Sequence, residues 1–155
     1  MISIKVAVEQ MAWANNRFFA FLETIPDEAW WAKIADGEWD IAHYAFHLVA
    51  SSDWYCYMLG QPLRYTSEPR SLAEVKALRP VINEFDAFLI AQASLDDETL
   101  TYIDDNEPRS MRRSMVLTQA LIHAVEHRTQ AVAALKLCGF YSPDLDSFSM
   151  WPYAD

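Results

Sequence analysis

Residues 114–138 read SMVLTQALIHAVEHRTQAVAALKLC and contain neither proline nor glycine. Apolar and small side chains recur along this stretch at steps of three and four residues, which is the spacing of one face of an α-helix. Gly139 follows, at the position where a glycine in the left-handed conformation ends many helices. The stretch therefore predicts one long helix from about Ser114 to Cys138.

The same helix places two histidines on its predicted buried face. One arc of the helical wheel holds Val116, Ala120, His123, His127, Ala131 and Ala134. The wheel places Thr118, Arg128 and Lys136 outside this arc. Because buried imidazoles need partners and the alanines leave space beside them, His123 and His127 are candidates for holding an ion.

The N-terminal stretch predicts a helix with one polar residue on its buried face. Ser3 is a suitable N-cap, and Pro26 is a suitable stop. One face of the helix between them holds Ile4, Val8, Met11, Asn15, Phe18, Leu22 and Ile25. We expect Asn15 to point into the core, where its amide needs a hydrogen-bond partner.

A second helix is predicted after a connector that contains a short helical segment at 26–33. Asp40 can cap this helix, which reaches about Leu59 and is followed by Gly60. The segment is apolar nearly all round, so we expect it to be the most deeply buried helix.

A third helix is predicted over 71–93, where Ser71 and Glu74 have the spacing of a capping box. Pro80 should kink or break it. The stretch 94–110 is rich in Asp, Asn and Pro, which predicts an acidic loop with a short strand at 101–103. Residues 140–155 predict a packed irregular arm. Four helices of this length are the ingredients of an all-α four-helix bundle.

Composition and charge restrict the classes of function. The 155 residues suit one domain, which we expect to span 1–155. The net charge of -10 opposes binding to nucleic acid or to an anionic membrane surface. No apolar run approaches the about 20 residues that a membrane span needs, and the N-terminus lacks a signal-peptide pattern, so we expect a cytoplasmic protein. We then expect Cys56 and Cys138 to be free thiols.

All four histidines lie in two pairs, His43 with His47 and His123 with His127. The i, i+4 spacing puts the two imidazoles of a pair on one helix face, one turn apart, and helical bundles build metal sites from such facing side chains. Core histidines bonded to carboxylates or to each other are the alternative. Two matched pairs favour a metal ion, and imidazole binds zinc, nickel and copper. A closed site of four histidines is possible, but we expect three histidines and water.

The stretch from His123 to His127 also matches H-x-x-E-H, the signature of inverted zinc proteases, with Glu126 as the general base. Those enzymes need a further glutamate ligand downstream. The only acids after His127 are Asp144, Asp146 and Asp155, and the chain is too short for such an enzyme. We therefore interpret Glu126 as a solvated or outer carboxylate.

Four short segments share a pattern with a known family. They are Ala14-Asn15, Ile25-Pro26-Asp27, Trp39-Asp40-Ile41 with His47-Leu48 eight positions after the tryptophan, and His123-Ala-Val-Glu-His127-Arg128-Thr129-Gln130. With these segments the chain resembles the DinB family over nearly its whole length. Thr129 stands where that family frequently has glycine.

The resemblance implies an up-down-down-up four-helix bundle, usually a homodimer, with a divalent metal ion between the second and fourth helices. The metal is zinc or nickel in most cases, held by three histidines and solvent. Residue by residue, His47, His123 and His127 carry over as the ligands. His43 falls where the family usually has a different residue, so we treat it as a neighbour of the site.

The family includes bacillithiol transferases and mycothiol-dependent isomerases. We therefore expect a metal-dependent transferase or hydrolase that activates a low-molecular-weight thiol, or water, toward an electrophilic small molecule. The alternative is a non-catalytic, stress-related metal-binding protein whose ion is structural. Arg112, Arg113 and Arg128 are candidates for binding substrate carboxylates, although surface solvation explains each equally well. Trp54, one to two turns after His47, is a candidate pocket wall.

Overall fold

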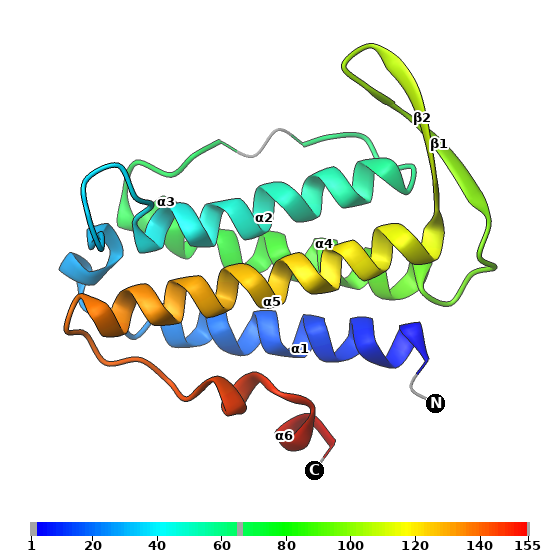
Figure 1. Cartoon of the computed structure of the whole chain (residues 1–155). Coiled ribbons are helices and arrows are strands. Elements are labelled where there is room, and N and C mark those ends of the chain that lie inside the picture. Colours follow the sequence, from blue (N-terminus) through cyan, green and yellow to red (C-terminus); the bar gives the residue numbers. More distant parts are fainter. Residues whose placement is uncertain (1–2, 65–66, 155) are drawn as a thin grey trace.

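The computed structural model describes residues 3–64 and 67–154, and most of these residues are helical. Four long helices lie side by side (Figure 1). They are α1 (Ile4–Leu22), α2 (Ile41–Met58), α4 (Leu78–Gln92) and α5 (Arg113–Leu137). The shorter elements are η1 (Asp27–Trp31), α3 (Leu72–Lys76), β1 (Thr99–Asp104), β2 (Glu107–Arg112), η2 (Leu145–Phe148) and α6 (Met150–Ala154).

The long helices contact one another in a closed ring. α1 and α2 each pack against both α4 and α5. α1 and α5 run in one direction, and α2 and α4 run in the other (Figure 1). α2 and α4 are parallel because α3, which leads into α4, lies beside the start of α2 (Figure 1). No helix in the described part of the chain is long and apolar enough to cross a membrane.

The predicted starts of α1 and α2 and the predicted end of α5 are confirmed by their capping bonds. Ser3 Oγ accepts a hydrogen bond from the amide of Val6, and the Asp40 carboxylate accepts one from His43. At the end of α5, Gly139 has φ +82° and donates to the carbonyl of Lys136. These local bonds satisfy backbone groups that a helix terminus leaves free.

The predicted break of the third helix is also confirmed, at Ala77, between α3 and α4. Pro80 lies in the first turn of α4, where its missing N–H costs no helical hydrogen bond. Ser71 Oγ accepts from the amide of Glu74, as the capping box predicts. The Glu74 carboxylate, however, accepts from the amide of Arg70, one residue before the cap.

Residues 99–112 form an antiparallel hairpin, so the prediction of an all-α fold is wrong for this segment. Asp105 and Asn106 form its turn with φ +50° and +63°, conformations that Asp and Asn tolerate and that a two-residue hairpin turn requires. The predicted strand at 101–103 is part of β1, but β2 was predicted as loop. The hairpin projects from one end of the helices (Figure 1).

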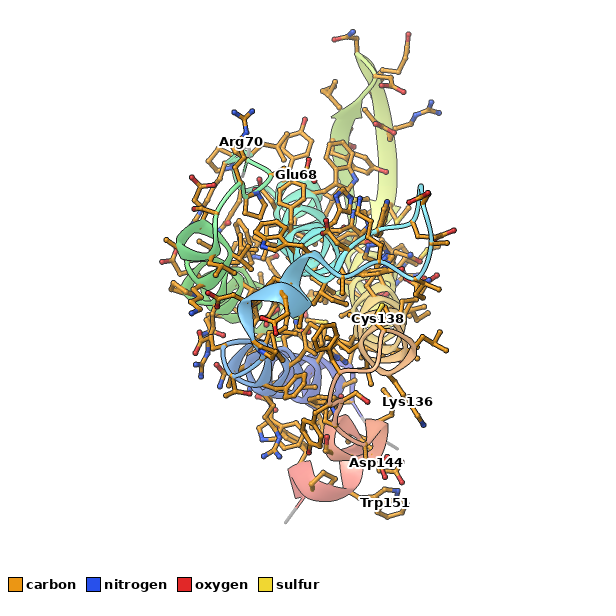
Figure 2. All side chains as sticks on the ribbon, turned by 90° about the vertical axis from the view of Figure 1, so that its left-hand side faces the viewer. Glu68, Arg70, Lys136, Cys138, Asp144 and Trp151 are labelled. Atoms are coloured by element: carbon orange, nitrogen blue, oxygen red, sulfur yellow. The ribbon has the colours of Figure 1, made fainter. Side chains whose placement is uncertain are left out.

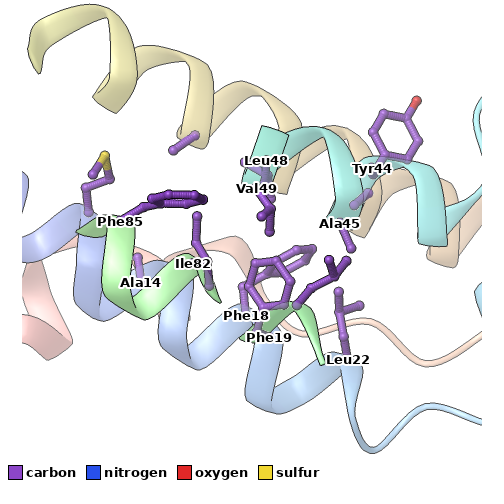
Figure 3. Packing of buried hydrophobic residues seen from close by; sticks show 14 of the residues in the cluster. Ala14, Phe18, Phe19, Leu22, Tyr44, Ala45, Leu48, Val49, Ile82 and Phe85 are labelled. Carbon is purple, nitrogen blue, oxygen red and sulfur yellow. The ribbon is translucent and has the colours of Figure 1, made fainter. Parts of the chain in front are cut away.

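The core lies between the helices and contains side chains from all four. Figure 3 shows Phe18, Val49, Ile82 and Phe85 turned toward one another from α1, α2 and α4. Cys56 is buried here, and its burial raises the pKa of its thiol to about 12. Both cysteines are free, as predicted, and the protonated Cys56 thiol is a poor nucleophile.

The C-terminal residues pack on α1 and are not a free end, as predicted. The side-chain amide of Gln10 donates a 2.6 Å hydrogen bond to the carbonyl of Phe148. The rings of Trp13 and Tyr153 lie 5.7 Å apart. Figure 2 views the helices end-on and shows this arm below them, with Trp151, 82% exposed, pointing away.

A polar network crosses the core between α1, α4 and α5. Asn15 is only 1% exposed, and its side-chain amide donates to both carboxylate oxygens of Asp86, at 3.2 and 3.0 Å. Its side-chain oxygen accepts from the guanidinium of Arg128. The inward orientation of Asn15 is thus confirmed. The placement of Arg128 outside the buried arc is wrong, because α5 buries a second face against α1 and leaves Arg128 3% exposed.

This network makes stability depend on pH. Burial raises the pKa of Asp86 to about 7, from an ordinary value of 3.8, although Asn15 and Arg128 oppose the shift. The folded protein therefore holds this proton more tightly than the unfolded chain, and the stability that it contributes is lost as the pH rises from about 4 to about 7.

In Asp86→Asn, which cannot ionise, we expect the unfolding free energy relative to wild type to increase over that pH range and to level off above it. Urea titrations at several pH values measure the difference. A difference that does not change with pH would contradict this assignment.

Candidate metal centre

The structure brings together the three histidines that the resemblance selects. α2 carries His47 and the antiparallel α5 carries His123 and His127, and the two helices are in contact. One ring nitrogen of each histidine lies within 4.8 Å of the others. Ring centroids are 4.2 to 5.0 Å apart. This arrangement of three imidazoles could hold a metal ion.

The distance between the ring nitrogens of His47 and His123 fits common coordination geometry. His47 Nε2 and His123 Nε2 are 3.1 Å apart. Two nitrogens bound to one tetrahedral zinc ion lie about 3.3 Å apart, as follows from Zn–N bonds of about 2.0 Å. The two imidazoles are thus close to the separation that a shared ion needs.

His43 lies beside this group and is not part of it. Its ring is parallel to that of His47 at 6.5 Å, and its Nδ1 is 2.7 Å from a carboxylate oxygen of Glu68. The structure therefore does not bring all four imidazoles to one point, and the closed four-histidine alternative is not supported. Glu126, in the H-x-x-E-H pattern, is exposed, as expected of a solvated carboxylate.

Burial favours the neutral form of His47 and His123. Burial, and then the proximity of His127, His123 and His43, lower the pKa of His47 to about 4. Burial and His127 also lower the pKa of His123. His127 is 7% exposed, and its Nδ1 is buried without a hydrogen-bond partner among the described residues. Neutral rings offer lone pairs to a metal ion, and a bound cation would compensate for the unpartnered ring nitrogen of His127. The residues present therefore fit a metal ion.

Aromatic side chains enclose one side of the histidines. The Trp39 ring lies 4.8 Å from that of His47 and 5.6 Å from that of His127. Tyr55 approaches His123 at 5.9 Å. Trp39 precedes the N-cap of α2, so helical spacing does not place it, and only the family motif singled it out.

Trp54, the predicted pocket wall, contacts other residues. Its ring neighbours are Tyr57 at 5.3 Å and Tyr102 of β1 at 6.2 Å. The prediction is wrong because the hairpin covers α2 at this level. The sequence pattern contained no information on what packs there.

The three candidate arginines make other contacts. Arg113 is buried and donates to Gln92 and Glu98, and Arg128 donates to Asn15 in the core. Surface solvation is therefore not the explanation for these two residues. Arg112 is exposed and pairs with Asp97 at 2.8 Å. All three pair with residues outside the histidine group.

One polar neighbour of the histidines was missed entirely. Ser51 Oγ lies 2.9 Å from His123 Nε2 and 3.4 Å from His47 Nε2. Ser51 is one helical turn after His47, so the i, i+4 spacing used for the histidines could have identified it.

The fold and these side chains define a helical protein with a candidate three-histidine metal centre. The sequence model of the DinB family matches residues 1–153, and the chain belongs to the DinB family. Among solved structures it is similar to a candidate DinB family member from Exiguobacterium sibiricum 255-15. That chain is 17% identical, with a TM-score of 0.65 over 94% of this chain and 99% of the other, so the likeness concerns the fold. No curated protein matches.

Proposed function

We propose that the protein binds one divalent ion, zinc or nickel, through His47, His123 and His127 within a single up-down-down-up four-helix bundle. We further propose that it is a transferase that activates a low-molecular-weight thiol, or water, toward an electrophilic small molecule. The observation that carries both proposals is the convergence of three imidazoles from two contacting helices.

The residues around this centre have distinct roles in the proposal. The three imidazoles hold the ion, and Trp39 excludes water from one side of it. His47 and His123 are only half-buried, which leaves access for a substrate. A bound ion of this kind supplies Lewis acidity that lowers the pKa of a coordinated thiol or water.

Other proposed properties rest on the net charge and on the family resemblance. The net charge of -10 supports a protein that binds neither nucleic acid nor an anionic membrane surface. The family resemblance supports a homodimer, and Met115, Ile122 and Val125 form an exposed apolar stripe on α5 that a second copy could cover. We also propose a cytoplasmic location.

Thiol conjugation tests the proposed activity. Protein loaded with zinc or nickel is incubated with a panel of cysteine-containing thiols and electrophiles such as 1-chloro-2,4-dinitrobenzene. We expect conjugation above the spontaneous rate, and its loss after chelation and in His123→Ala, because the proposed thiol activation requires the ion.

A blank result with every thiol would count against catalysis. If chelation of that same protein also lowered its melting temperature strongly, the ion would be structural. The observation that favours this second function is that the three histidines join α2 to α5, so an ion would cross-link two helices.

A further inference from the structure

The hydroxyl of Ser51 forms a compact triangle with two of the candidate ligands. Ser51 Oγ lies 2.9 Å from His123 Nε2 and 3.4 Å from His47 Nε2. The two nitrogens are 3.1 Å apart. All three sides of the triangle are therefore close to one length.

That length is the edge of a coordination tetrahedron. Oxygen and nitrogen ligands about 2.0 Å from one zinc ion lie about 3.3 Å from each other. His127 contributes a further nitrogen within 4.8 Å of those of His47 and His123. The four side chains thus form a set of three nitrogens and one oxygen.

The position also argues against a role outside the coordination sphere. A nitrogen that binds an ion has used its lone pair and can no longer accept a hydrogen bond from a hydroxyl. Without an ion, the hydroxyl is hydrogen-bonded to these nitrogens. An ion that took up their lone pairs would replace both hydrogen bonds, and coordination to that ion would then keep the hydroxyl oxygen at this position.

We infer that Ser51 Oγ is the fourth ligand of the ion in the substrate-free protein and that a substrate thiolate displaces it. This inference rests on the metal centre proposed above. A neutral hydroxyl is a weak ligand, whereas thiolate sulfur is a preferred ligand of zinc, so the exchange favours the substrate. The thiol gives its proton to the solvent, the resulting thiolate takes the place of the hydroxyl on the ion, and the displaced hydroxyl remains protonated.

Cobalt-substituted protein tests the inference, because the visible spectrum of Co²⁺ reports its ligands. Wild type, Ser51→Ala and the control Ser52→Ala are loaded with Co²⁺ and titrated with 2-mercaptoethanol. We expect Ser51→Ala to bind the thiol severalfold more tightly than wild type, because no protein ligand must be displaced. Ser52→Ala, the same change at the next residue of α2, should behave as wild type.

Equal or weaker thiol binding by Ser51→Ala would overturn the inference and leave the three-histidine centre intact. Failure of wild type to bind Co²⁺ would overturn the metal centre and this inference together. Ser51→Cys provides a second measurement that does not depend on the alanine variant. We expect an intense sulfur-to-cobalt charge-transfer band without added thiol, and its absence in Co²⁺-loaded protein would also overturn the inference.

Discussion

His123→Ala is expected to lose stoichiometric metal binding, with an affinity reduced by more than about 100-fold. Loss of a residue that only orients a ligand costs about 10–100-fold, and loss of a direct ligand should cost more. The ring of His123 lies 5.0 Å from that of His47 and 4.2 Å from that of His127, so its loss removes one side of the cluster. Competition with a chromophoric chelator measures the affinity, and elemental analysis of untagged protein gives the stoichiometry and the metal.

His43→Ala is the matched control, because it also removes a histidine side chain, one helical turn before His47 on α2. His43 is hydrogen-bonded to Glu68 and lies outside the group of three. We expect this variant to retain one ion per chain. Equal loss of metal in both variants would show that the ligand set is wrong.

Arg128→Ala is expected to destabilise the protein by about 3–5 kcal/mol at pH 8, the range for breaking a buried ionic interaction by removing one partner. Arg128 is 3% exposed and Asp86 is 2% exposed. Above the raised pKa of Asp86 its carboxylate is charged, and the variant leaves that charge without its cation. Chemical denaturation in the presence of a chelator measures the effect without a contribution from bound metal.

Arg109→Ala is the control for this prediction, since Arg109 is an exposed residue of the hairpin. Its substitution should change stability by less than about 0.5 kcal/mol. A similar small effect in Arg128→Ala would mean that Arg128 and Asp86 do not depend on each other in the folded protein.

The helices could be predicted because their signals are local. Ser3 and Asp40 hydrogen-bond to amides three residues away, and Gly139 ends α5 through its own backbone conformation. The hairpin was only half predicted. Its turn residues, Asp105 and Asn106, also suit a loop, and the pairing of β1 with β2 depends on contacts between strands.

The candidate site was likewise only partly predictable from the sequence. The i, i+4 spacing predicted that His123 and His127 share one face of a helix, because helix geometry alone determines this. The family motif, and not the spacing, selected His47 in preference to His43. In the structure His47, and not His43, lies with His123 and His127, because α5 lies against α2 where His47 and Ser51 project.

The sequence by itself determined where the long helices begin and end, which residues form their apolar faces, and that two pairs of histidines each share a helix face. Only the tertiary structure decided which of these imidazoles meet, that Arg128 is buried beside Asn15, and that Tyr102 covers Trp54. The physical reason is the range of the interactions. Capping and periodicity act within a few residues, whereas these contacts depend on the relative positions of helices far apart in the chain.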